Sequence, residues 1–147
     1  HLRPRRQRQM CIRDSYLSKK AKKVFGFEVI RSALDDAEKN AVRNNISNIV
    51  FVKANLDTFF KSGQLPKRVP KPDVIVVDPP RAGMHEDMTN YLPKLGAKKI
   101  IYASCNPTTQ ARDAKILNAY GYRIISSTMV DMFPHTPHIE TVMLFSK

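Results

Sequence analysis

The stretch VFGFEVIRSALDDAEKNAVRNNISNIVFVKAN, residues 24–55, decides the fold. Its first part, residues 24–30, is a short apolar run that predicts a buried strand. The following segment predicts a helix, because its apolar residues recur at the spacing of one helix face. These residues are Ile30, Ala33, Leu34, Ala37 and Ala41. A second strand is predicted over residues 48–55, and a strand, a helix and a strand in this order are typical of an α/β fold.

The same alternation continues to the end of the chain. Further strands are predicted at residues 73–81, 98–104, 122–133 and 139–147, and helices at residues 84–96 and 108–120. This rhythm predicts a mostly parallel sheet with helices on both faces. The last two strands are joined by a connection that is too short for a crossover helix. We therefore expect them to pair antiparallel, as a C-terminal hairpin.

Composition places the chain among cytoplasmic proteins. The 147 residues are 42% hydrophobic, enough for one domain with a core, and no apolar run is long enough to span a membrane. We see no secretory signal and expect no membrane partner. Two cysteines, Cys11 and Cys105, are too few for a disulfide framework or a metal cluster. A reducing cytoplasmic compartment follows, and we expect a monomer.

The net charge of +12 indicates either a polyanionic partner, with nucleic acid first, or simply a lysine-rich protein. Part of this charge lies in residues 1–15, HLRPRRQRQMCIRDS, which hold five arginines and no lysine. This segment is either a basic arm for RNA or, as we favour, a non-native leader, since it resembles a translated sequencing-adapter read. We expect it to be disordered, and we expect no role for Cys11. Residues 16–147 then form the domain.

A chemically able side chain closes each of four successive predicted strands. These side chains are Glu28, Asn55, Asp78 and Cys105. In an open α/β sheet, ligands bind outside the carboxyl ends of the strands. Any one of these residues is ordinary where a strand leaves the core. Four together predict a binding rim.

Two of these positions carry further signals. Glu28 can accept hydrogen bonds from a ribose diol, or it can complement the dipole of the helix that follows it. Asp78 opens the segment DPPR, residues 78–81, in which two prolines make a rigid corner without backbone donors. Arg81 either pairs with a phosphate or covers the sheet edge.

Cys105 lies directly before a predicted helix, with Asn106 as candidate N-cap and Pro107 at the first helical position. The dipole of that helix favours a thiolate, so Cys105 is a candidate nucleophile; the alternative is a small buried residue at a strand end. Glu140, at the start of the last strand, is a second candidate. His135 and His138 stand near it, but no zinc-binding spacing accompanies them, and we expect no metal.

Three motifs together resemble the carboxy-terminal catalytic domain of the RNA uracil-5-methyltransferases. They are DPPRAG, YASCNPTTQARD and VDMFPHTPHIETVMLFS. The resemblance runs from about Tyr16 to Lys147 and is strongest to the enzymes that modify 23S ribosomal RNA, with the transfer-RNA enzymes second. It implies a Rossmann-like class I methyltransferase fold, S-adenosyl-L-methionine as cofactor and RNA as partner.

The resemblance also implies roles for individual residues. Cys105 would add to C6 of a uridine, and Glu140 would remove the C5 proton after methyl transfer. Glu28, Asn55 and Asp78 would contact S-adenosylmethionine. The target uridine would be unpaired or flipped out of its stack to be reached.

The chain also departs from the family pattern. The family's first strand, its glycine-rich loop and its amino-terminal RNA-binding regions have no counterpart here. We therefore expect a truncated domain that by itself binds the cofactor poorly or not at all. Two other functions stay open: a non-catalytic RNA-binding module, and an amino-methylating enzyme with a DPP motif. Arg81 argues against the second, because those enzymes carry an aromatic residue at that position.

Overall fold

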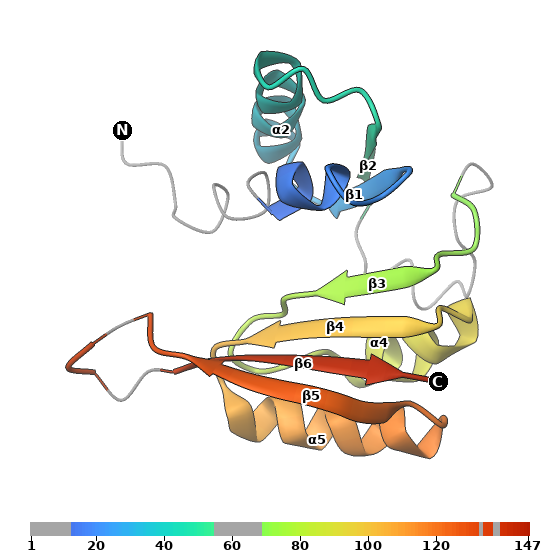
Figure 1. The fold of residues 1–147 in the computed structure, drawn as a ribbon, viewed down its shortest axis with the longest axis vertical. Helices are drawn as coiled ribbons and strands as arrows, with labels where there is room; N and C mark the ends of the chain where they lie inside the picture. The colour runs from blue at the N-terminus through green and yellow to red at the C-terminus, as the bar shows by residue number, and fades with distance from the viewer. Residues whose placement is uncertain (1–12, 55–68, 133, 137–138) are drawn as a thin grey trace. The chain divides into compact units, whose positions relative to one another are not determined.

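The computed structural model describes residues 13–54, 69–132, 134–136 and 139–147. The chain forms two compact units, His1–Phe59 and Phe60–Lys147. The predicted site residue Asn55 and the residues Phe133, Pro137 and His138 lie outside the described residues. Each unit is an α/β structure in its own right (Figure 1).

Unit 1 is a strand, a helix and a strand. Strand β1, Val24–Glu28, pairs in parallel with β2, Ile49–Lys53, from Val24 opposite Ile49 to Glu28 opposite Lys53. Helix α2, Arg31–Arg43, makes the connection between them (Figure 1). Residues 13–18 are also helical, so the last three residues assigned to the leader, 13–15, have regular structure.

Helix α2 confirms the predicted apolar face. Four of the five predicted residues are buried: Ala33, Leu34, Ala37 and Ala41. Ile30 is the exception, because it is the N-cap residue, extended and 46% exposed, and so lies before the first turn. Asn44 is the C-cap residue of the helix, and Asn45 takes a positive φ of 54°. Asparagine tolerates this conformation better than most residues.

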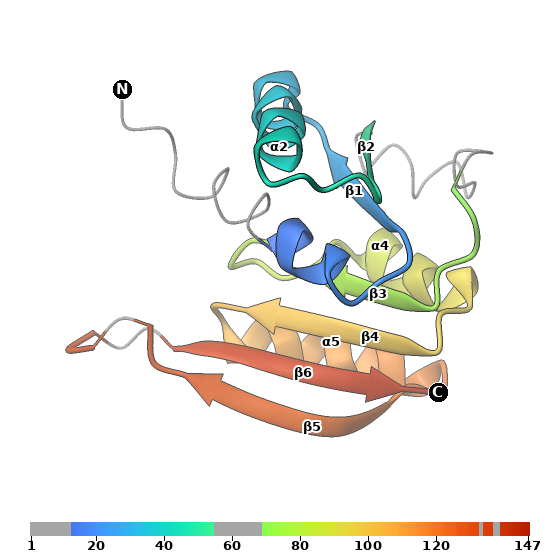
Figure 2. The ribbon, with the colours of Figure 1, turned by 45° about the horizontal axis from the view of Figure 1, so that its top comes forward.

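Unit 2 contains a four-stranded sheet in the order β3–β4–β6–β5 (Figures 1 and 2). The strands are β3, Val74–Val77; β4, Lys99–Ser104; β5, Arg123–Val130; and β6, Glu140–Ser146. Strands β3 and β4 are parallel, whereas β6 is antiparallel to both of its neighbours. The predicted hairpin of β5 and β6 is therefore confirmed. Its second strand inserts beside β4, so the sheet is mixed.

Two helices cover one face of this sheet. Helix α4, Glu86–Tyr91, continues into the 3₁₀ turn η1, Leu92–Leu95, where Pro93 prevents further α-helical hydrogen bonding. Helix α5, Pro107–Ala119, is packed against β4 and β5 and also touches α4. Both views show α5 lying along one side of the β4–β6–β5 strands (Figures 1 and 2).

The core of unit 2 lies between α5 and the strand residues that face it. Ile100, Tyr102 and Phe145 are fully buried, as is Leu117 on the helix. Side chains alternate between the two faces of a strand, so Ser104 and Thr141 belong to the same inner face. Both are buried. The inner face is therefore apolar at one end and polar at the carboxyl end of β4. In the described parts of the chain, no helix is long and apolar enough to cross a membrane.

Candidate active site at the carboxyl end of β4

The antiparallel register of β4 and β6 brings Cys105 and Glu140 to the same end of the sheet, where β4 ends and β6 begins. The last pair of this ladder is Ser104 opposite Thr141. Cys105 is the next residue along β4, and Glu140 is the residue before Thr141 on β6. The two residues therefore follow directly from one cross-strand pair, although they are far apart in sequence.

Asp78 lies at the same end of the unit 2 sheet. It directly follows β3, whose last residue, Val77, pairs with Tyr102 of the parallel strand β4. Three neighbouring strands thus place Asp78, Cys105 and Glu140 at one rim. The structure brings together these three of the five predicted site residues.

The backbone around Cys105 is fixed by the residues on either side of it. Its thiol is free and half-buried. The Ser104 hydroxyl accepts a hydrogen bond from the Asn106 N–H at 3.1 Å and lies 3.1 Å from the Asn106 carbonyl oxygen. Asn106 is the N-cap of α5, as predicted, because its side chain accepts from the Thr108 N–H at 3.1 Å. The cysteine is therefore held between a strand end and a helix start.

A buried glutamine ties the strand that carries Glu140 to the strand that carries Cys105. Gln110 is fully buried on α5, and its Nε2 donates to the Tyr102 carbonyl at 2.8 Å. The Thr141 hydroxyl donates to Gln110 Oε1 at 2.6 Å. Because buried polar groups are costly when they lack partners, these bonds fix the spacing of the two strand ends.

Asp113 forms a second buried polar centre on α5. Its carboxylate is 1% exposed, and Oδ2 accepts from the Tyr102 hydroxyl at 2.7 Å and from the Met84 N–H at 2.8 Å. Oδ1 accepts from Arg112 Nη2 at 2.8 Å. Burial first, and then the hydrogen bond to Asp113, raise the pKa of Tyr102 above its usual value. Tyr102 therefore stays a neutral donor to this carboxylate.

Glu28 lies in unit 1, at the carboxyl end of β1. Its Oε1 accepts from the N–H groups of Val29 and Ile30 at 2.7 and 2.9 Å. These groups immediately precede α2, so the carboxylate is oriented by the backbone at the helix start. No hydrogen bond to Oε2 is found within the described part of the chain, which leaves that oxygen able to accept from a ligand hydroxyl.

Sequence reasoning did not single out Ser104, Gln110, Asp113 or Thr141 as functional. A signal existed for two of them, because Gln110 and Asp113 are spaced i, i+3 with Ala114 and Leu117 on the buried face of α5. Polar residues inside an otherwise apolar helix stripe indicate buried hydrogen-bond partners. Ser104 and Thr141 gave no such signal, since single hydroxyl residues are common at strand ends.

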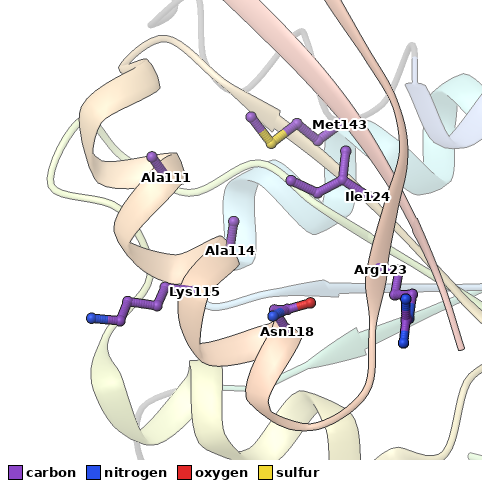
Figure 3. Close-up of a pocket in the computed structure, with 7 residues that line it drawn as sticks. All are labelled: Ala111, Ala114, Lys115, Asn118, Arg123, Ile124 and Met143. Atoms are coloured by element: carbon purple, nitrogen blue, oxygen red, sulfur yellow. The ribbon is translucent and has the colours of Figure 1, made fainter.

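A separate pocket lies on the α5 side of the sheet (Figure 3). It is lined by residues of α5, β5 and β6: Ala111, Ala114, Lys115, Asn118, Arg123, Ile124 and Met143. Arg123 and Ile124 pair with Ser146 and Phe145, at the other end of β6 from Glu140. This pocket includes none of the predicted site residues.

Comparison with known proteins places the chain in a family. A family described as tRNA (Uracil-5-)-methyltransferase matches residues 14–147. The chain belongs to this family. The resemblance seen in the sequence motifs is therefore confirmed, and the match includes the last two residues of the segment assigned to the leader. Members of the family are methyltransferases that use S-adenosylmethionine and act on RNA.

Two curated relatives are similar over most of the chain. An RNA methyltransferase of Chlorobaculum tepidum is 47% identical over 132 residues, which are 90% of this chain and 27% of the relative. One of Staphylococcus epidermidis is 46% identical over 130 residues, 88% of this chain and 28% of the relative. Both relatives are described as uncharacterized. The chain spans little more than a quarter of the length of these proteins.

Two solved structures show the same fold. The tRNA (uracil-54, C5)-methyltransferase of Pyrococcus abyssi, in complex with S-adenosyl-L-homocysteine, is 37% identical, with a TM-score of 0.71 over 88% of this chain and 30% of that one. A Streptococcus pneumoniae putative tRNA (m1A22) methyltransferase, in complex with S-adenosyl-L-methionine, is 16% identical, with a TM-score of 0.67 over 93% and 61%. The Rossmann-like class I methyltransferase fold is therefore confirmed.

Proposed function

We propose that this chain carries the catalytic residues of an RNA (uracil-5-)-methyltransferase. The reaction transfers a methyl group from S-adenosylmethionine to C5 of a uridine, with Cys105 as nucleophile and Glu140 as base. One observation carries the proposal: the pairing of Ser104 with Thr141 puts Cys105 and Glu140 at the same edge, on adjacent strands. A thiol and a carboxylate so placed can reach one pyrimidine ring.

The chemistry requires both groups. The Cys105 thiolate adds to C6 of the uracil and forms a C–S bond, and the electron pair of the C5=C6 bond moves into an enolate. This raises the electron density at C5, which takes the methyl group. Glu140 then removes the C5 proton, the C5=C6 bond forms again, and the thiolate leaves C6. A thiolate suits this sequence because it is both a good nucleophile and a good leaving group.

The acidic residues present fit the cofactor. When bound, S-adenosylmethionine supplies a sulfonium methyl group as the electrophile. In unit 1, Oε1 of Glu28 accepts from the backbone N–H groups of Val29 and Ile30, and Oε2 can accept from a ribose hydroxyl. In unit 2, Asp78 follows β3 at the rim that carries Cys105. We propose Glu28, Asp78 and Asn55 as its contacts.

For the RNA, we propose 23S ribosomal RNA, on the likeness of the segment DMFPHTPHIETVMLFS to the ribosomal subtype. Transfer RNA is the second candidate, because a tRNA (uracil-54, C5)-methyltransferase is 37% identical to this chain. The positive charge that lies outside residues 1–15 supports either polyanion. Exposed lysines at 19, 20, 22 and 23, before β1, add to this charge.

Trapping with RNA that contains 5-fluorouridine tests the reaction. Fluorine replaces the C5 proton, so Glu140 cannot complete the elimination and the protein stays bound to the methylated RNA. We expect a covalent adduct with the protein made from the complete gene that encodes this chain, and none with Cys105→Ala. An adduct that persists in Cys105→Ala would refute the assignment of the nucleophile.

The matched variant Glu140→Gln separates the base from the nucleophile. With ordinary uridine RNA, we expect it to accumulate the methylated adduct, which the wild type releases. Binding of RNA without any adduct in the wild type would instead support a non-catalytic RNA-binding module. Mass spectrometry of digested 23S ribosomal RNA and transfer RNA then identifies the substrate. The 147-residue chain alone is titrated with S-adenosylmethionine in parallel, and we expect weak binding or none.

A further inference from the structure

One face of α5 holds the loop that follows β3. The loop, residues 78–84, contains the motif DPPRAG, and the face is formed by Asn106, Thr109, Arg112 and Asp113, which we call the α5 clamp. The amide of Asn106 donates to the Arg81 carbonyl at 3.0 Å, and the Thr109 hydroxyl lies 3.1 Å from the same oxygen. The clamp therefore binds the loop through a backbone carbonyl group.

The second half of the clamp is ionic. Arg112 Nη2 lies 3.1 Å from the Ala82 carbonyl oxygen and 3.2 Å from that of Met84. Asp113 accepts from the Met84 N–H at 2.8 Å. The pair Arg112–Asp113 is itself joined at 2.8 Å, and the Asp113 side chain is 1% exposed. Hydrogen bonds to charged groups are among the stronger ones in proteins, so this half contributes most.

We infer that the α5 clamp is a positioning device for catalysis, which aligns the Asp78 loop with Cys105. The argument rests on connectivity. The same helix starts one residue after Cys105 and then binds the loop at Arg81, Ala82 and Met84. Pro79 and Pro80 have no backbone N–H, and the Gly83 N–H closes a turn on the Pro80 carbonyl at 2.8 Å, so the clamp supplies the bonds that join this turn to the helix.

This inference rests on the proposed function and adds residues to it. Arg112 and Asp113 act through the loop, so they are positioning residues. Cys105 is positioned by β4 and by the bond from the Asn106 N–H to the Ser104 hydroxyl, neither of which involves Arg112 or Asp113. A weakened clamp should therefore impair binding of S-adenosylmethionine through Asp78 more than it impairs the thiol.

The test compares two variants of the protein made from the complete gene. Arg112→Met removes the contacts to Ala82 and Met84 from a half-exposed side chain. Lys115→Met removes the same charge from an exposed position on the same helix and is the matched control. We expect Arg112→Met to weaken S-adenosylmethionine binding by about 10-fold, as for the loss of a hydrogen bond to a charged group, and Lys115→Met to leave it unchanged.

One further readout separates this inference from the proposed function. Amide hydrogen exchange of Met84 needs no cofactor, and Arg112→Met should accelerate it by about 10-fold. Wild-type affinity together with wild-type exchange in Arg112→Met would overturn the clamp. A wild type without cofactor binding or adduct would overturn the proposed function, while the exchange rates would still decide on the clamp. If Arg112→Met does not fold, Thr109→Val, which removes one hydroxyl, replaces it and should show the same changes to a smaller degree.

Discussion

Substitution of Gly83 by alanine should damage the loop after β3 more than an ordinary glycine substitution does. Gly83 has a φ of 82°, a conformation that costs an alanine about 1–2 kcal/mol. A Cβ at this position would also lie 2.6 Å from Arg112 Nη2 and 2.9 Å from Asp113 Oδ2. The arginine end can move aside. The buried carboxylate cannot move without weakening a hydrogen bond, which adds about 1.5–3 kcal/mol.

Gly121 provides the matched control in the same unit. Its φ is 90°, but the nearest atoms to a Cβ there would be those of the Lys147 side chain, from 3.4 Å, which is ordinary contact. Gly121→Ala should therefore lose about 1–2 kcal/mol of unfolding free energy, the backbone cost alone. Urea denaturation measures both variants, through midpoints at an unchanged slope. Equal losses for Gly83→Ala and Gly121→Ala would refute the claim that the clamp crowds the loop.

Three further predictions concern the polar side chains of β4, β6 and the start of α5. Gln110→Met and Thr141→Val should each lower the unfolding free energy by about 1–3 kcal/mol. In a double-mutant cycle, the double variant should lose less than the sum of the two single losses. Strict additivity would contradict the bond between the two side chains. The difference in unfolding free energy between wild type and Tyr102→Phe should narrow as pH rises above 10.0. The pKa of Tyr102 is raised in the folded state, so only the unfolded wild type loses this proton, and the wild type loses up to about 1.4 kcal/mol of stability per pH unit. A constant difference in alkaline denaturation would argue against a protonated Tyr102. Asn106→Ala should cost about 1–2 kcal/mol in thermal unfolding and Asn106→Ser less, because both lose the bond to Arg81 but serine still caps α5. Equal costs for the two variants would mean that the cap to the Thr108 N–H adds nothing.

Much of the fold was predictable from the sequence because its signals are local. The apolar spacing from Ala33 to Ala41 specifies one helix face, and Asn106 with Pro107 marks a helix start. The short connection before β6 requires an antiparallel partner for β5. Each of these patterns depends on neighbours along the chain, so no tertiary information was needed.

The candidate site was predictable only in part, because its geometry depends on pairing between distant segments. That Cys105 and Glu140 share an edge follows from β6 lying between β4 and β5, and nothing in the sequence specifies this order. The clamp was missed for a related reason. Asp113 lies on the apolar stripe of its helix, but the partner that buries it is a loop 29 residues away, which no local pattern identifies.

The outermost strand, β5, affects the tendency of the protein to aggregate. Every residue of β5 is exposed, including Ile124, Ile125 and Met129, and β5 is the outermost strand of its sheet in the described part of the chain. A strand of this kind offers a template on which another molecule can add a strand, which is a route to aggregation. The irregularity between Ile124 and Ser126 breaks the flat row of backbone groups, and the charge of Arg123 opposes close approach of a second copy. The bulge and the charge of Arg123 thus both act against the addition of a strand to β5.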